Sequence, residues 1–338
     1  CDDGKYPIYG SGGIMGYAND YICKAETVVI GRKGSINKPI FVETPFWNVD
    51  TAFGLCANSE KLNPKYLYYF CEKFDFEKLN TTVTIPSLTK SNLLNVEIPL
   101  PNLEKQKQIV ELLDKITSLI SLRKQQLAKL DELVKAQFAN TFENDANFHT
   151  DYMENLSEFV TVGIANSATH AYAEHGVVML RNQNIKENHL DDTELVYIEP
   201  KFADKYKSKK LEANDILVTR TGYPGIACVV PQKYAGSQTF TTLIIRLKKG
   251  TNASSCYICH YINSSHGKKY VSGTKVGVAQ QNFGAKVLAK MPVIVPPIEL
   301  QNQFATFVAR IDQQKQTVQQ SLEKLELMKK ALMQEYFG

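Results

Sequence analysis

The alternation of apolar and polar residues is most regular in two stretches of equal length, residues 101–142 and 296–337. Apolar side chains recur there at alternating steps of four and three, which places them in one narrow stripe along an α-helix. After their opening prolines, neither stretch contains Pro or Gly, and both are rich in Gln, Glu, Lys and Leu, which favour helix. Each stretch therefore predicts one long helix, roughly 60 Å in length at 1.5 Å per residue.

A stripe this narrow predicts a coiled coil in which the two helices bury their apolar residues against each other. The alternative is that each helix packs on its own domain. Arg123, Lys315 and Lys329 fall on the stripe, and we expect them to find polar partners or to extend to its edge. The residues expected to pair are Ile109, Leu113, Ile116, Ile120, Leu127 and Leu130 in the first helix, and Phe304, Val308, Ile311, Val318, Leu322 and Leu325 in the second.

The two stretches are copies of one another, related without gaps by an offset of 195 residues. The matches at the start of each helix are Pro101 with Pro296, Glu104 with Glu299, Gln106 with Gln301 and Gln108 with Gln303. A weaker match at an offset of 188 relates residues 27–34 to residues 215–222, each a short apolar run followed by Arg-x-Gly. By that alignment the first half lacks a counterpart to residues 147–188, so we expect the first globule to be incomplete at its N-terminus.

The pattern outside the helices predicts two globules of mixed strand and helix. Short apolar runs predict strands near residues 28–30, 39–42 and 51–56 in the first, and six more between residues 159 and 247 in the second. Residues 64–78 and 256–270 have helical periodicity. The expected domains are residues 1–98, a first globule; 99–142, a first long helix; 143–295, a second globule; and 296–338, a second long helix.

The predicted fold class is α+β: two mixed α/β globules separated by two long antiparallel coiled-coil helices, with a pseudo-two-fold internal repeat. Antiparallel pairing would place the globules at opposite ends of a rod and hold two different binding domains at a fixed distance.

Composition adds little to this picture. A net charge of +4, from 39 Lys and Arg against 35 Asp and Glu, is compatible with nucleic-acid binding without arguing for it. No run of 18 apolar residues predicts a membrane span, and no secretion signal is visible. Seven irregularly spaced cysteines then favour a reducing compartment, and we expect a cytoplasmic protein.

The usual catalytic constellations are absent from the sequence. There is no phosphate-binding Gly-x-x-x-x-Gly-Lys-Ser/Thr loop, no His-Glu-x-x-His and no Gly-x-Ser-x-Gly. The Cys256-x-x-Cys259-His260 stretch formally matches a haem-attachment pattern, but nothing in the sequence supports export or an axial ligand, and packed thiols in an amphipathic helix are the favoured interpretation. We expect no catalytic residue, no metal and no cofactor in this chain.

Basic and amide side chains instead gather in turns flanked by glycine, in both globules. Arg, Asn and Gln can form paired hydrogen bonds with purine edges, whereas Lys, Ser and Thr suit phosphates. Each residue taken singly can also be an ordinary solvated side chain. The candidate DNA-binding residues are Arg32, Lys33, Asn37, Lys38, Thr84, Ser87 and Lys90 in the first globule, and Arg181, Asn182, Gln183, Arg220, Thr221, Tyr223, Thr274, Lys275, Gln280, Gln281 and Asn282 in the second.

These features together resemble the specificity subunit of type I restriction–modification enzymes. The resemblance rests on the duplicated globule-plus-helix plan, the Pro-x-Leu/Ile-Glu-x-Gln-x-Gln start of each helix, and the apolar run with Arg-x-Gly in each globule. The stretches 6–13 (YPIYGSGG) and 45–51 (PFWNVDT) are also frequent in such domains.

The resemblance implies a non-catalytic reader of double-stranded DNA, with one globule for each half of a split, asymmetric site and the paired helices as a spacer. The implied partners are adenine-N6 methyltransferase subunits and a restriction subunit with motor and nuclease activity. S-adenosylmethionine and ATP would bind to those partners. Two alternatives remain: a coiled-coil scaffold for protein interactions without DNA reading, and a self-contained enzyme whose site has no familiar motif.

Overall fold

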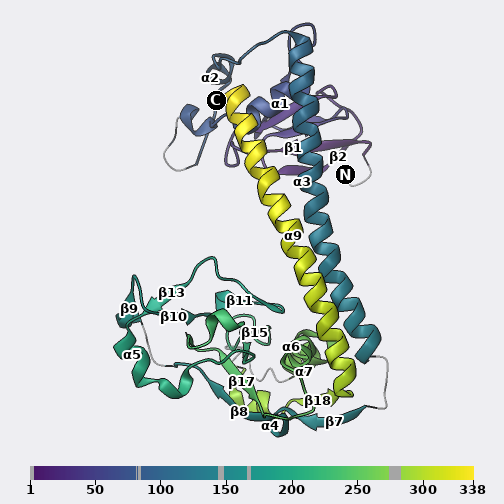
Figure 1. Cartoon of the computed structure of the whole chain (residues 1–338). Helices are drawn as coiled ribbons and strands as arrows, with labels where there is room; N and C mark the ends of the chain where they lie inside the picture. The colour runs from purple at the N-terminus through teal and green to yellow at the C-terminus, as the bar shows by residue number, and fades with distance from the viewer. Residues whose placement is uncertain (1–3, 81, 83–84, 144–147, 166–168, 274–282) are drawn as a thin grey trace. The chain divides into compact units, whose positions relative to one another are not determined.

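The computed structural model describes residues 4–80, 82, 85–143, 148–165, 169–273 and 283–338, and these form two compact units (Figure 1). Unit 1 comprises residues 1–128 and 316–338, and unit 2 comprises residues 129–315. The boundary between the units cuts both long helices, α3 (Leu103–Phe138) and α9 (Ile298–Phe337). Each unit thus contains one globule together with part of each long helix.

Unit 1 contains two three-stranded sheets. The first, in the order β2-β1-β5, is made of β1 (Tyr6–Gly10), β2 (Gly13–Ala18) and β5 (Trp47–Asn48). The second, in the order β4-β3-β6, is made of β3 (Thr27–Gly31), β4 (Ile40–Val42) and β6 (Ala52–Cys56). A glycine-rich turn connects β1 to β2, and the three strands expected from apolar runs are confirmed within one or two residues.

The core of unit 1 lies between β3, helix α1 (Pro64–Lys73) and the two long helices. Val28, Tyr66 and Phe70 are buried there with Leu113 of α3 and Phe337 of α9. The helix expected over residues 64–78 ends at Lys73, and a 3-10 helix (Phe76–Leu79) follows. Asp75 caps the 3-10 helix by accepting a hydrogen bond from the backbone N–H of Glu77. The 3-10 helix is therefore an element separate from α1. A short helix, α2 (Lys90–Leu94), precedes α3.

Unit 2 is built around the four-stranded antiparallel sheet β15-β14-β17-β8. Its strands are β8 (Ser157–Val162), β14 (Ile216–Val218), β15 (Ala227–Val229) and β17 (Leu243–Leu247). A second sheet has the order β16-β10-β13-β9, with β9 (Tyr172–Ala173), β10 (Val177–Leu180), β13 (Val196–Ile198) and β16 (Gln238–Thr239). Unit 2 also contains two two-stranded antiparallel sheets: β11 (Ile185–Lys186) with β12 (His189–Leu190), and β7 (His149–Tyr152) with β18 (Pro292–Val295).

Unit 2 also contains several short helices. They are α4 (Met153–Leu156), α5 (Pro200–Lys205), α6 (Ser255–Asn263), α7 (Ser265–Gly273) and α8 (Ala285–Ala289). The single helix expected over residues 256–270 is wrong, because the chain leaves helical geometry at Ser264. The Ser264 hydroxyl there donates to the carbonyl of Tyr261, which competes with continued helix.

The internal repeat is visible in the sheets as well as in the long helices. The order β4-β3-β6 in unit 1 corresponds to β15-β14-β17 in unit 2, with all pairs antiparallel. Helices α1 and α2 correspond to α6 and α8 by position along the chain. Strand β8, which pairs with β17, has no counterpart beside β6 among the described residues.

The two long helices run antiparallel within each unit, as expected from the sequence. In unit 1, Lys124 of α3 forms an ion pair with Glu326 of α9, with 2.8 Å between Nζ and Oε1. In unit 2, the rings of Phe138 and Phe304 lie 5.4 Å apart, so a later position on α3 meets an earlier one on α9. Of the stripe residues, those that are buried are Ile109, Leu113, Ile116, Phe304, Val308, Ile311, Val318 and Leu322, and those that are half-buried are Ile120, Leu127, Leu130 and Leu325.

The charged residues on the stripe have polar partners. Lys315 contacts Asp131 across the helix pair in unit 2, and Lys329 Nζ lies 2.9 Å from Glu72 Oε1 in unit 1. The Arg123 guanidinium donates to Gln126 on the same helix. These side chains place their charges at the edge of the seam while their stems pack along it.

A buried glutamine explains why both helices begin with the same motif. Gln106 Oε1 accepts a hydrogen bond from the backbone N–H of Asn63, the N-cap residue of α1, and its Nε2 donates to the carbonyls of Lys61 and Pro101. Its repeat partner, Gln301, is equally inaccessible to solvent. It accepts from the N–H of Ser254, the N-cap residue of α6, and donates to the carbonyls of Asn252 and Pro296. The amide thus ties the start of a long helix to the start of a globule helix in both units.

His260 of α6 gives unit 2 a pH-dependent stability. It is buried beside Phe138 and Phe304, and burial together with the charge of Lys315 lowers the pKa of His260 from 6.5 to about 4. Because this pKa is depressed in the folded state, the unfolded chain binds more protons between those values, and stability falls as the pH falls below about 6.5. We expect unit 2 to lose about 2 kcal/mol between pH 7.5 and pH 5 from this group.

The check is urea denaturation of the wild type and of His260→Gln at both pH values. The pH dependence of the wild type should exceed that of the variant by this amount. Equal pH dependence in the two proteins would contradict the assignment.

Within the described residues, no helix is long and apolar enough to cross a membrane, and no group of His, Cys, Asp and Glu has the arrangement of a metal site. The six described cysteines are free thiols, and Cys259 of the haem-like stretch is buried in the core of unit 2.

Candidate nucleic-acid interface

Each unit presents an arginine on a turn that follows its central buried strand. Arg32 follows β3 and Arg220 follows β14. The glycine two residues later, Gly34 or Gly222, has a φ of +80° or +73°, a conformation that glycine adopts without steric cost. The same strand and the same turn geometry therefore present an arginine in both halves of the repeat.

The backbone of each arginine is fixed by an equivalent hydrogen bond. The carbonyl of Arg32 accepts from the N–H of Leu88 at 2.9 Å, and that of Arg220 accepts from the N–H of Phe283 at 3.2 Å. Leu88 and Phe283 are buried and are themselves related by the repeat offset of 195. The segment before α2 or α8 thus lies against the arginine turn in the same way in both units.

In unit 1 this arrangement gathers several candidate residues on one edge. Lys33 forms an isolated antiparallel bridge with Ser87, and the N–H of Gly34 donates to Pro86. The Arg32 guanidinium lies 5.9 Å from the centre of the Phe53 ring and donates to the carbonyl of Asp50. Arg32 and Lys33 are exposed, so both can contact a negatively charged backbone.

The remaining candidates in unit 1 are less well placed. The Asn37 amide donates to Asp75 and accepts from the N–H of Phe76, so its hydrogen-bonding groups already stabilise the 3-10 turn. Lys38 and Lys90 are exposed, Lys90 at the start of α2. Thr84 lies outside the described residues.

In unit 2 the structure brings together two stretches that are 39 residues apart in sequence. The Asn182 side-chain amide donates to the Thr221 hydroxyl at 2.8 Å, which joins the turn after β10 to the turn after β14. Arg181 donates to the carbonyl of Glu194, and Gln183 donates to the Glu194 carboxylate. Tyr223 is 84% exposed at the tip of the arginine turn.

Several polar atoms in this cluster are buried without an internal partner. The Nε atoms of Arg181 and Arg220 and the Oδ1 atom of Asn182 have no hydrogen bond to any described residue. Buried polar groups are nearly always paired, so such atoms point to a partner beyond the described residues, such as water or a ligand. Thr274, Lys275, Gln280, Gln281 and Asn282 lie outside the described residues.

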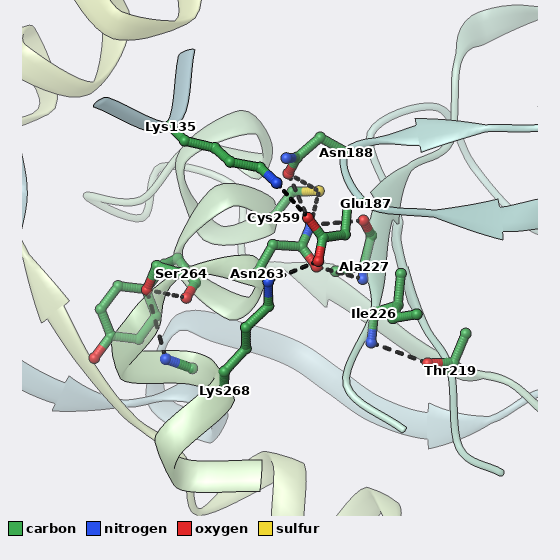
Figure 2. A network of polar contacts seen from close by, with 12 residues as sticks. Lys135, Glu187, Asn188, Thr219, Ile226, Ala227, Cys259, Asn263, Ser264 and Lys268 are labelled. Atoms are coloured by element: carbon green, nitrogen blue, oxygen red, sulfur yellow. Dashed lines mark hydrogen bonds and ion pairs between the residues drawn. The ribbon is translucent and has the colours of Figure 1, made fainter. Parts of the chain in front are cut away.

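A polar network behind the turn fixes its shape, and the sequence analysis did not predict it (Figure 2). The Thr219 hydroxyl donates to the carbonyl of Tyr223 at 2.6 Å and accepts from the N–H of Ile226 at 2.9 Å. The next strand residue, Ala227, exchanges two hydrogen bonds of 2.9 Å with the side chain of Asn263 on α6. A buried asparagine within the apolar helix was the one signal in the sequence that could have revealed this contact.

The same network reaches the long helix. Asn263 Nδ2 also donates to the side chain of Asn188, which follows Glu187 in the β11–β12 turn (Figure 2). The Glu187 carboxylate pairs with Lys135 of α3 at 3.1 Å and with Lys268 of α7 at 2.6 Å. These ion pairs lower the pKa of Glu187, against the opposing effect of its partial burial, and keep it ionised. The arginine turn is thus connected to α3 through side chains within unit 2.

The sequence model of the type I restriction modification DNA specificity domain matches residues 1–132 and 147–327, which is most of the chain. The chain belongs to this family. It is 22% identical over 325 residues to a putative type I restriction enzyme specificity subunit of Haemophilus influenzae, covering 91% of this chain and 80% of the relative. It is equally identical to the EcoBI specificity subunit of Escherichia coli over 342 residues, covering 92% and 70%.

Solved structures agree on the fold of this specificity subunit. It superimposes on the type I restriction–modification S subunit of M. genitalium with a TM-score of 0.63 at 14% identity, covering 100% of this chain and 90% of that one. A chain from a structural study of complex assembly in the type I system gives a TM-score of 0.59 at 14% identity, covering 93% and 82%. The expected fold class, with two target-recognition globules and two long helices, is confirmed.

Proposed function

We propose that this specificity subunit reads one half of a split, asymmetric DNA site with each of its units. The observation that carries the proposal is the matched pair of arginine turns, Arg32 with Gly34 and Arg220 with Gly222. Arginine is the side chain that most often reads guanine, through paired hydrogen bonds to O6 and N7. The residues around the two turns differ, which suits recognition of two different half-sites.

The subunit acts without catalysis of its own, as the DNA-recognition part of a type I restriction–modification complex. It directs adenine-N6 methylation by methyltransferase subunits that dock on its helices, and restriction by a motor-nuclease subunit. S-adenosylmethionine and ATP bind to those partners. The repetition of the long helices supports docking of equivalent partners at equivalent places on the repeat.

We expect Arg220→Ala, in a complex assembled with its methyltransferase subunits, to weaken DNA binding by about 1–3 kcal/mol and to relax the preference at one half-site. Arg32→Ala should relax the other half. Arg310, which is exposed on α9 and belongs to neither turn, provides the matched control, and Arg310→Ala should leave the preference unchanged. The measurement is competition binding with duplexes altered in one half at a time.

Two outcomes would contradict the proposal. One is an equal loss at both half-sites in either arginine variant. The other is an affinity that does not change between 50 and 200 mM salt, since phosphate contacts release counterions and make binding salt-dependent. Salt-independent behaviour would favour the alternative of a protein-interaction scaffold.

A further inference from the structure

We propose that Tyr223 inserts its ring at one base step of the half-site that unit 2 reads and partly unstacks that step. This inference rests on the proposed function, DNA reading by the Arg220 turn, and adds a contact that senses the deformability of DNA. The Tyr223 side chain is 84% exposed, the largest exposed fraction among the large apolar side chains that the structure describes. An aromatic ring on the same turn as an arginine offers a stacking surface and a positive charge to the same stretch of DNA.

Hydrogen bonds within the turn hold Tyr223 at its tip. The N–H of Thr219 donates to the carbonyl of Ile226 at 2.9 Å, and the N–H of Gly225 donates to the carbonyl of Thr219 at 3.0 Å. The Thr219 hydroxyl donates to the carbonyl of Tyr223. It also accepts from the N–H of Ile226 (Figure 2). These bonds close residues 219–226 into one loop and involve only the backbone of Tyr223, so its side chain can be replaced without breaking them.

Neighbouring segments of unit 2 support this loop from two sides. The Thr221 hydroxyl accepts a hydrogen bond from the side chain of Asn182, which belongs to the turn after β10. Gly225, at a φ of +89°, approaches α7 so closely that a Cβ atom there would lie 2.7 Å from Cγ2 of Val271. A loop fixed in this way presents the ring without further ordering of the backbone, which lowers the entropic cost of binding.

The same loop carries a second, independent sign of an external partner. The Nε atom of Arg220 is buried and has no hydrogen bond to any described residue. Buried donors are nearly always satisfied, so this atom points to water or a ligand at the turn. Because Arg220 and Tyr223 lie on one closed loop, DNA that binds the guanidinium also meets the ring.

The internal repeat provides a comparison that lacks the ring. Alignment of the two arginine turns places Ser35 of unit 1 at the position of Tyr223, and Ile36 at the position of Pro224. Ser35 is half-buried, and Ile36 is 1% exposed in the core of unit 1. The turn of unit 1 therefore leads back into its core where the turn of unit 2 presents an aromatic ring. We expect the deformation in one half-site only.

The preferred base step follows from the cost of unstacking. The pyrimidine–purine steps TA and CA/TG unstack and kink more easily than other steps. A side chain inserted between bases kinks the duplex, and the kink allows more contact with the protein. Stacking itself tolerates any base, so the selectivity of Tyr223 lies in the step. We therefore expect a TA or CA/TG step in the half-site that unit 2 reads.

The test is permanganate oxidation, which attacks unstacked thymines, and every TA or CA/TG step contains a thymine. The complex with the methyltransferase subunits is bound to a duplex carrying the split motif that methylation mapping defines. We expect one thymine in the half-site read by the Arg220 turn to react with permanganate in the wild-type complex. Tyr223→Ala should abolish this reactivity and weaken binding about tenfold, because the stacking contact is lost.

Two further variants complete the design. Tyr223→Phe should keep both the reactivity and the affinity, because the ring and not the hydroxyl makes the contact. Tyr152→Ala is the matched control, since Tyr152 is 52% exposed in unit 2 and belongs to neither arginine turn, and it should behave as the wild type. Thymines that react equally in all variants report the action of the partner subunits on the DNA and serve as an internal reference.

Failure of this inference can be told apart from failure of the proposed function. A half-site preference that depends on Arg220, without any thymine whose reactivity depends on Tyr223, would overturn the inference and leave DNA reading in place. The same holds if Tyr223→Phe behaves like Tyr223→Ala, or if the Tyr223-dependent thymine lies in the half-site read by Arg32. A complex that shows no half-site preference at all would contradict the proposed function and this inference together.

Discussion

Replacing Gln301 with alanine is expected to lower the free energy of unfolding of unit 2 by about 3–5 kcal/mol, and Gln106→Ala to do the same in unit 1. Each glutamine is fully buried and makes three hydrogen bonds to backbone groups. Removing one partner leaves buried backbone groups unsatisfied, at a cost of roughly 1–3 kcal/mol for each group. Hydrogen exchange followed by mass spectrometry measures the loss separately in each unit.

The motif provides its own control. Gln108 and Gln303 stand two residues later, are also related by the repeat, and are exposed. Their alanine variants should change stability by less than about 0.5 kcal/mol, as surface substitutions generally do. If the Gln106 and Gln301 variants were equally neutral, the buried amides would have no structural role and the shared motif would need another explanation.

The second large effect is expected from Arg246→Ala, which should destabilise unit 2 by about 3–5 kcal/mol. Arg246 forms a paired interaction with Asp215, with Nε to Oδ1 at 2.8 Å and Nη2 to Oδ2 at 2.7 Å. Asp215 is 2% exposed and directly precedes β14, the strand that leads to the Arg220 turn. Without Arg246, a buried carboxylate loses its main partner. Urea denaturation monitored by circular dichroism measures the change.

Lys210→Ala serves as the comparison, because Lys210 and Asp204 form an ion pair with both side chains exposed. Exposed pairs contribute about 0–1 kcal/mol, so this variant should stay close to the wild type. A similar small effect for Arg246→Ala would mean that Asp215 is not held by the pair. We also expect Arg246→Ala to weaken DNA recognition at the half-site read by the Arg220 turn, since β14 supports that turn.

The long helices and the central strands could be predicted because their signals are local. A four-three spacing specifies a helix stripe by itself, and runs such as Val28–Ile30 or Val177–Leu180 lie within the observed strands. The repeat offset added long-range information, since residues aligned by it share a structural role. Leu88 and Phe283 are an example, because each makes the same backbone contact to its arginine turn.

Other features depend on contacts between distant residues and left no local signal. The pairing of β7 with β18 joins residues that are 140 or more positions apart. The hydrogen bond between Asn182 and Thr221 depends on the meeting of two turns. Gln106 and Gln301 stand out in the sequence as part of a repeated motif. Their burial, however, depends on contacts with the loops that precede α1 and α6, which the motif does not reveal. Of the candidate DNA-binding residues, Arg32, Lys33 and Ser87 lie together in unit 1. In unit 2, Asn182 forms a hydrogen bond with Thr221. The roles of all these residues in DNA reading stay a prediction.

The most direct test of the account is to map adenine methylation on DNA treated with the methyltransferase subunits and this chain, and with the Arg220→Ala chain. The account predicts methylation at a single split motif that depends on the chain, and relaxed sequence at one half of that motif in the variant. A complex that assembles but methylates no split motif, or a motif that persists when the chain is left out, would contradict it.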